Sequence, residues 1–163
     1  MQLYLMQHGQ ALAEELDPEQ PLSPEGVAQI KASARAMKRM GINLDLIVSS
    51  PKRRSHQTAA LVAEAVNYPY SDIVETEAVK PLASARESLD FLMRQKDCRS
   101  VLVAGHLPCL AEIASALLAG DGKVSLGFAN GGLCLLEAPS LAGADAELRY
   151  FLSPQQMSLI ATG

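Results

Sequence analysis

The sequence predicts an α/β fold, a three-layer α/β/α sandwich with a mostly parallel sheet between helices. Two observations lead to this prediction. Short apolar stretches of strand length alternate along the chain with longer stretches whose apolar residues have helical spacing. No proline-, glycine- or serine-rich segment is long enough to act as a linker. We therefore expect residues 1–163 to form a single domain.

The first strand and the first helix have clear boundaries. Residues 2–6 are short and apolar-rich, and the polar Gln7 marks the carboxyl end of this strand. In Ser23-Pro24-Glu25, the serine provides a side-chain cap, the proline suits the first helical position and the glutamate complements the helix dipole. The first helix is therefore expected over residues 24–40, before Gly41.

The middle of the chain repeats the strand-helix pattern. Residues 44–49 form an apolar strand, and Pro51 opens a helix expected over residues 51–66. Residues 73–76 are a weaker candidate for an edge strand, and residues 85–96 have the apolar spacing of a further helix.

The last third of the chain adds a buried strand, a helix and two closing strands. Residues 101–104 are apolar throughout, and Gly105-His106-Leu107-Pro108 then turns into a helix that ends at Gly120. Residues 133–137 and 148–152 are expected to be the closing strands.

Three of the predicted strands carry polar residues at the point where they end. Gln7-His8-Gly9 follows the first strand, Ser50-Pro51 with Arg54 just beyond follows the second, and Gly105-His106 follows the buried strand. In open α/β sheets, sites form at the carboxyl ends of the strands. We therefore expect these residues to meet at one edge of the sheet.

This set of residues suits phosphoryl transfer. A neutral imidazole carries a lone pair, so His8 can attack phosphorus without a strong neighbouring base. Arg54, in the first turn of its helix, offers a planar fork to a phosphoryl group. His106 at another helix start can donate a second hydrogen bond, and Gly9 lets the backbone close in beside the nucleophile.

Composition narrows the function classes. The formal charge of −4 disfavours nucleic acid as a partner. The apolar runs are too short to span a bilayer, and Met1 leads directly into a strand without a signal-peptide pattern, so we expect a cytoplasmic protein with no membrane partner. Cys98, Cys109 and Cys134 are odd in number and widely spaced, which predicts free thiols.

Four segments, in this order and without insertions, carry a family resemblance. They are residues 5–11 with Gln7-His8-Gly9, 21–26, 50–58 with Arg54, and 101–108 with His106. Over nearly its whole length the chain resembles the histidine phosphatase superfamily, and most closely its short SixA-type phosphohistidine phosphatase branch.

The resemblance implies a phosphoglycerate mutase-like fold with no metal and no organic cofactor. It implies that His8 is the phosphorylated nucleophile, and that Gln7, Gly9, Arg54 and His106 hold the phosphoryl group. The implied substrate is phosphohistidine on a signalling or phosphotransfer protein, such as a histidine phosphotransfer domain.

The chain departs from the family pattern at Gln7, which stands where the family has arginine. A hydrogen bond to a charged group is worth about 1.5–3 kcal/mol, so this change is expected to lower transition-state binding about tenfold to a hundredfold. The amide of Gln7 can still donate a hydrogen bond to a phosphoryl oxygen. Larger relatives also carry an acid after the third strand, where this chain has only Glu75 and Glu77. A phosphoramidate substrate tolerates a missing acid, because protonated imidazole is a good leaving group.

Two alternatives stay open: a catalytically weak or inactive phosphate- or phosphoprotein-binding module, and a broad-specificity small-molecule phosphatase. A metal site from His8, His56 and His106 is disfavoured. His56 lies two residues past Arg54, about 200° around a helix, so the two side chains should face apart.

The first predicted helix also carries a basic stripe of Lys31, Arg35, Lys38 and Arg39 at helical spacing. This stripe is either a docking surface for an acidic phosphoprotein or an ordinary solvated helix face.

Overall fold

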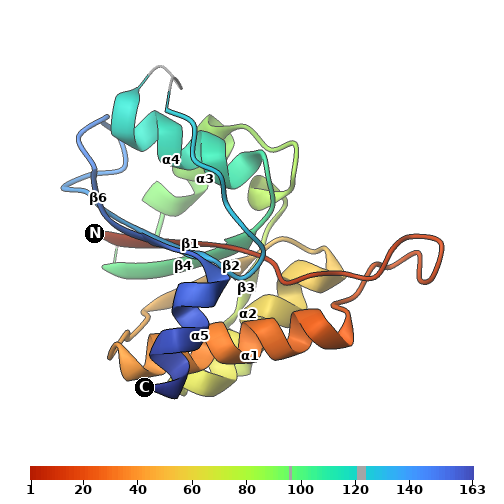
Figure 1. The fold of residues 1–163 in the computed structure, drawn as a ribbon. Coiled ribbons are helices and arrows are strands. Elements are labelled where there is room, and N and C mark those ends of the chain that lie inside the picture. Colours follow the sequence, from red (N-terminus) through yellow and green to blue (C-terminus); the bar gives the residue numbers. More distant parts are fainter. Residues whose placement is uncertain (96, 121–123) are drawn as a thin grey trace.

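In the computed structural model, a six-stranded sheet lies between two layers of helices (Figure 1). The structure describes residues 1–95, 97–120 and 124–163. The strands are β1 (Gln2–Gln7), β2 (Leu46–Ser49), β3 (Val74–Glu75), β4 (Ser100–Gly105), β5 (Leu133–Glu137) and β6 (Glu147–Leu152). The helices are α1 (Pro24–Arg39), α2 (Arg53–Val66), α3 (Ala85–Met93), α4 (Cys109–Ala119) and α5 (Pro154–Thr162). The predicted α/β sandwich is confirmed.

The order of the strands brings three carboxyl ends together. The strand order in the sheet is β3-β2-β4-β1-β5-β6. The first four strands in this order are parallel to one another, whereas β5 is antiparallel to both β1 and β6. Gln7 of β1 is in register with Gly105 of β4, and Ser49 of β2 is in register with Ala104. The residues that follow these strands therefore start from neighbouring points of one sheet edge.

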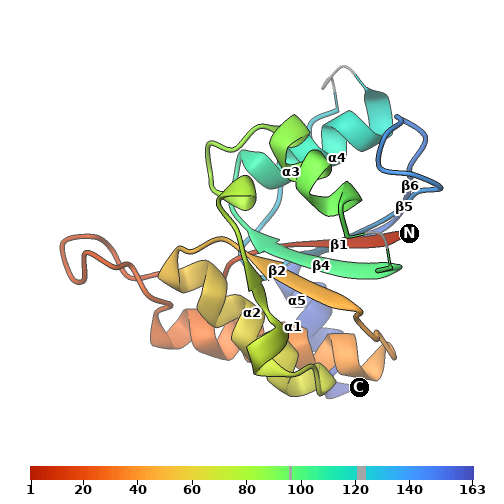
Figure 2. The same ribbon diagram turned by 180° about the vertical axis from the view of Figure 1, so that it is seen from behind.

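Alternate side chains of the central strands face opposite helical layers. Leu3 and Leu5 of β1 belong to a core with α3 and α4, whereas Tyr4 and Met6 belong to a core with α1, α2 and α5. Figure 2 shows the same two layers from behind. Because both faces are covered, the central strands are apolar on both sides, as the sequence indicated.

Among the α-helices of the described residues, α5 was not predicted from the sequence. At the start of α5, the Ser153 hydroxyl accepts the N–H of Gln156 at 3.2 Å, and the Gln156 side-chain oxygen accepts the N–H of Ser153 at 2.8 Å. This reciprocal capping box follows a serine-proline start like that of α1, so the signal was present in the sequence.

Two helix boundaries differ from the prediction. Helix α2 begins at Arg53 instead of Pro51. The Ser50 hydroxyl accepts the N–H of Lys52 at 3.3 Å and holds this stretch out of the helix. Helix α3 ends at Met93, and its predicted end, Lys96, lies outside the described residues.

Residues 10–20 leave the sheet edge as an extended arm (Figure 1). The base of this arm is closed by a bridge between Ala11 and Leu22 and by the Leu12 N–H, which donates to the Pro21 carbonyl at 2.8 Å. Among the helices of the described segments, none is both long enough and apolar enough to cross a membrane.

Candidate active site

His8 follows β1 directly and is held by its main chain. Its N–H donates to the Gly105 carbonyl at 3.0 Å, and the Asn130 amide donates to the His8 carbonyl at 2.7 Å. The ring Nδ1 lies 2.7 Å from the Gly9 carbonyl oxygen, which can only accept, so Nδ1 carries the hydrogen. Burial lowers the pKa of His8, the Gly9 hydrogen bond partly opposes this, and Arg54 lowers it further. The ring is therefore neutral at pH 7, with its lone pair on Nε2.

Arg54 is the second residue of α2 and faces this lone pair. Its Nε donates to His8 Nε2 at 3.1 Å, and its Nη1 donates to the Gln20 side-chain oxygen at 2.8 Å. Gln20 has a φ of 46°, a strained region for a residue other than glycine. The Thr58 hydroxyl donates to the Arg54 carbonyl at 2.8 Å and accepts the Gly9 N–H at 3.2 Å. The guanidinium is thus fixed between the histidine and the arm.

His106 lies between β4 and α4 and is buried. Its ring centroid is 4.8 Å from that of His8, with the two planes 61° apart. Its Nε2 lies 2.6 Å from the Ser50 hydroxyl, whereas Nδ1 is buried without a hydrogen-bond partner among the described residues. Burial first, and then the electrostatic effect of the nearby His8, Arg54 and Lys52 side chains, lower the pKa of His106 to about 3. This ring is also neutral at pH 7.

Gln7 and Gly9 flank the nucleophilic candidate in different ways. The side-chain oxygen of Gln7 is buried and has no partner within the described part of the chain. A Cβ at Gly9 would meet Ile30 Cγ1 at 2.7 Å and the Gly26 carbonyl at 2.9 Å, so glycine allows α1 to approach this loop. The contacts of Gly9 orient His8 and tie it to α2, and a direct contact between Gly9 and phosphate stays a prediction.

The predicted site residues therefore come together, and His56 lies apart from them. Its Nε2 is 2.7 Å from the Tyr70 hydroxyl, and its Nδ1 is 2.8 Å from Glu75 Oε1. These contacts link α2 to the segment around β3 and turn the ring away from His8. Over residues 1–95, 97–120 and 124–163, no group of three or more His, Cys, Asp or Glu side chains could hold a metal ion.

A cleft of about 280 Å³ opens beside this group. It is lined by the end of the arm, the start of α2, Glu77 and Lys80. Four of its lining side chains are cationic, namely Lys52, Arg53, Arg54 and Lys80, against two carboxylates. Glu77 is already ion-paired with Lys80, so the opening suits an anionic substrate.

The geometry agrees with comparisons to known proteins. The family model described as "Histidine phosphatase superfamily (branch 1)" matches residues 3–79. An uncharacterized protein of Picosynechococcus sp. is 31% identical over 95% of this chain and 98% of its own. The chain belongs to the histidine phosphatase superfamily.

Further relatives place this superfamily member in the SixA-type branch, as its motifs predicted. The phosphohistidine phosphatase SixA of Escherichia coli is 27% identical over 74% of this chain and 76% of its own. The structure of the protein histidine phosphatase SixA complexed with tungstate superposes with a TM-score of 0.84 at 22% identity, covering 95% of this chain and 98% of that one, which confirms the fold. Membership in the superfamily supports a phosphatase activity.

Three residues that this histidine phosphatase places at its site were not predicted from the sequence. In the sequence Ser50 marks only the end of a strand, although its place directly after β2 is a usable signal. Gln20 and Asn130 come from loops whose sequences carry no periodic pattern, so their contacts with Arg54 and His8 required the fold.

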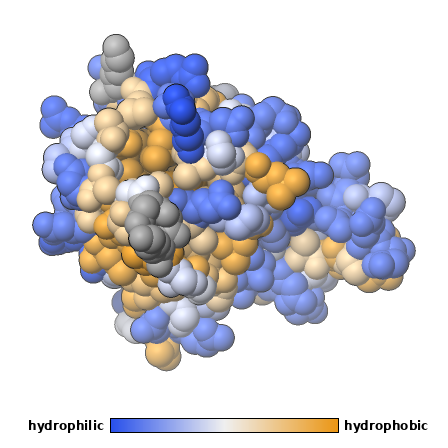
Figure 3. Space-filling model, turned by 90° about the horizontal axis from the view of Figure 1, so that it is seen from above, coloured by the Kyte–Doolittle hydropathy of each residue, from blue (hydrophilic) through white to orange (hydrophobic). Residues whose placement is uncertain are grey.

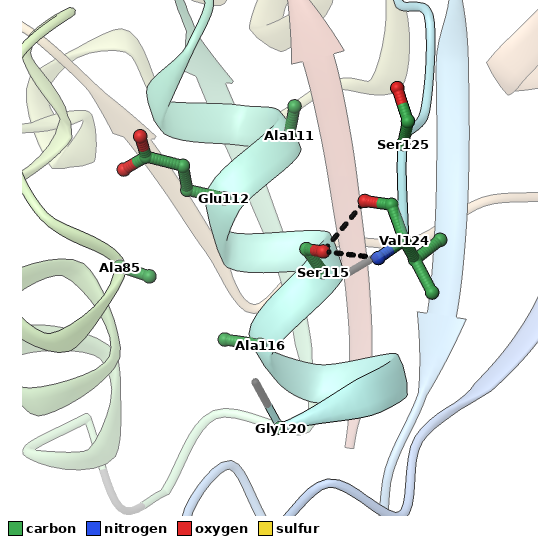
Figure 4. A pocket seen from close by; sticks show the side chains of 8 residues that line it. All are labelled: Ala85, Ala111, Glu112, Ser115, Ala116, Gly120, Val124 and Ser125. Carbon is green, nitrogen blue, oxygen red and sulfur yellow. Dashed lines mark hydrogen bonds between the residues drawn. The ribbon is translucent and has the colours of Figure 1, made fainter. Parts of the chain in front are cut away.

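Two further cavities lie in the layer of α3 and α4. One, of about 460 Å³, is lined mainly by small side chains of these helices and by Val124 and Ser125 (Figure 4). There the Ser115 hydroxyl donates to the Val124 carbonyl at 2.6 Å and accepts its N–H at 3.0 Å. Figure 3 looks onto this layer and shows apolar residues in the middle of the face. None of the predicted site residues lines this cavity.

Proposed function

We propose that this protein is a phosphohistidine phosphatase in which His8 attacks phosphorus and becomes transiently phosphorylated. The observation that carries the proposal is the orientation of the His8 ring. The Gly9 carbonyl holds the hydrogen on Nδ1, so the lone pair on Nε2 faces Arg54, the cation best placed to bind a phosphoryl group.

The reaction has two displacement steps. In the first, a bond forms between His8 Nε2 and phosphorus while the bond between phosphorus and the substrate imidazole breaks, and the imidazole leaves with the electron pair and a proton from solvent. In the second, water attacks phosphorus, the bond to Nε2 breaks, and inorganic phosphate is released. A nucleophile that is neutral at pH 7 is ready for the first step without prior loss of a proton.

Three side chains are proposed to hold the equatorial phosphoryl oxygens. Arg54 supplies charge and a planar set of donors. His106 Nδ1, which is buried without a partner among the described residues, and the amide nitrogen of Gln7 are the other proposed donors. Buried polar atoms of this kind are normally satisfied by a ligand or by water.

The two acids at and just after β3 favour a substrate that needs no proton donor. Glu77 is ion-paired with Lys80, and Glu75 contacts His56. An alkoxide leaving group requires a general acid, whereas the imidazole of phosphohistidine leaves readily once protonated. These contacts therefore support a phosphoramidate as the substrate class.

The proposed partner is a protein that carries phosphohistidine, with a histidine phosphotransfer domain as the specific candidate. The Escherichia coli relative, a phosphohistidine phosphatase, supports this substrate. The basic stripe on α1 is compatible with an acidic partner, since Lys31, Arg35, Lys38 and Arg39 are all exposed.

The test is hydrolysis of phosphoramidate, a histidine-phosphorylated phosphotransfer domain and phosphoserine by wild type and His8→Ala. We expect wild type to cleave the two phosphoramidates and His8→Ala to be inactive. If both proteins were inert while inorganic phosphate still bound, the chain would be a phosphate-binding module. Equal rates on phosphoserine would instead indicate a broad-specificity phosphatase.

A further inference from the structure

The hydroxyl of Ser50 has a restricted set of partners. Ser50 is fully buried directly after β2, and its Oγ contacts His106 Nε2 at 2.6 Å and the N–H of Lys52 at 3.3 Å. The Lys52 N–H is a donor and cannot accept the hydroxyl hydrogen. Among the described residues, His106 Nε2 is therefore the acceptor available to Ser50.

The hydrogen-bond partners of Ser50 distinguish the two neutral forms of His106. If Nε2 carried the hydrogen, it would donate to Ser50 and leave the buried serine hydrogen without an acceptor. If Nδ1 carries the hydrogen, Ser50 donates to the lone pair of Nε2 and the hydroxyl is satisfied. A buried hydroxyl that loses its acceptor is costly, so the second form is favoured.

We infer that Ser50 is a positioning residue that holds His106 as the Nδ1–H tautomer and so directs a hydrogen-bond donor to the phosphoryl group. This inference rests on the proposed function for its catalytic consequence. Nδ1 is the buried His106 atom without a protein partner in the described structure, and the ring lies 4.8 Å from that of His8. The neutral state of His106 makes the choice of tautomer decisive, because a single N–H is available.

The two histidines of the site are then set in the same tautomer by different means. A backbone carbonyl accepts from Nδ1 of His8 and leaves Nε2 free to attack. A serine hydroxyl donates to Nε2 of His106 and leaves Nδ1–H free to bind oxygen. The site thus presents one lone pair and one N–H to the same substrate.

The direct test is the ¹⁵N NMR spectrum of the histidine side chains in the unliganded wild-type protein at pH 7. We expect His106 to show a protonated Nδ1 and an unprotonated Nε2, with the hydrogen on Nδ1 lost or exchanging between the nitrogens in Ser50→Ala. A protonated Nε2 in the wild type would overturn the inference. This measurement needs no turnover, so it is independent of the proposed function.

The kinetic test compares Ser50→Ala with Ser88→Ala, which removes a different fully buried serine hydroxyl, on α3. We expect kcat for phosphoramidate to fall about tenfold in Ser50→Ala with little change in KM, and Ser50→Thr to retain more activity than Ser50→Ala. Equal kcat in the two alanine variants would contradict the positioning role. If wild type itself were inactive, the proposed function would fail and the NMR result would still decide the tautomer.

Discussion

Arg54 Nε donates its hydrogen to Nε2 of His8 across 3.1 Å, so the guanidinium covers the lone pair with which His8 is proposed to attack. The same side chain is held from the other side by Gln20 of the arm. To reach His8, a phosphoryl group must enter between the two side chains. Arg54 Nε then donates to a charged phosphoryl oxygen instead of to the neutral Nε2 of His8. In the proposed mechanism, Arg54 therefore covers His8 in the free enzyme and is the first group to bind the substrate.

Removal of this cation is expected to be costly for catalysis. Arg54→Ala should lower kcat/KM for phosphoramidate about tenfold to a hundredfold, because charge-assisted hydrogen bonds are worth about 1.5–3 kcal/mol. Arg54→Lys should recover only part of this loss, since a point charge replaces a planar set of donors. Steady-state kinetics on the purified variants checks both expectations, and a fully active lysine variant would argue against planar recognition.

At Gln7, a positive charge can be added to the site instead of removed from it. Gln7→Arg restores the residue that the superfamily motif carries, and its added charge is expected to raise kcat/KM for phosphoramidate about tenfold. Gln7→Leu removes the amide and serves as the control, with a lower kcat/KM expected. If Gln7→Arg remained no faster than wild type in the same assay, the missing positive charge at position 7 would not limit catalysis.

The sequence predicted the fold and the central group of residues because both depend on local signals. Apolar runs located the strands, and their polar ends located His8, Arg54 and His106. The roles of Gln20 and Asn130 could not be predicted, since their contacts join segments that are 34 and 122 residues apart. The tautomers also required coordinates, because they depend on which atoms lie within hydrogen-bond distance.

The buried neutral state of His106 predicts a pH-dependent stability. Below the unfolded pKa near 6.5, the unfolded chain binds a proton that folded His106 takes up only near pH 3, so the free energy of unfolding falls as the pH falls through this window. Between pH 7 and pH 5, wild type should lose about 2 kcal/mol more than His106→Gln. Urea denaturation of both proteins at the two pH values checks this, and equal losses would contradict the buried neutral state.

The basic stripe on α1 provides a test of the protein substrate. Lys31→Glu/Arg35→Glu should raise the KM for a histidine-phosphorylated phosphotransfer domain and leave the KM for phosphoramidate unchanged. Arg86→Glu/Arg94→Glu makes the same change of charge within α3 and directly after it, in the other helical layer, and should affect neither substrate. An unchanged KM for the protein substrate in the α1 variant would make the stripe an ordinary solvated face.

The central claim concerns the atom that forms the bond to phosphorus, and a trapped phosphoenzyme tests it most directly. The protein would be quenched during turnover of ³²P-labelled phosphoramidate and the label mapped by peptide analysis. We predict an acid-labile, base-stable label on His8 in wild type and none in His8→Ala. A label on another residue, or clear turnover with no label at all, would contradict a phospho-His8 intermediate.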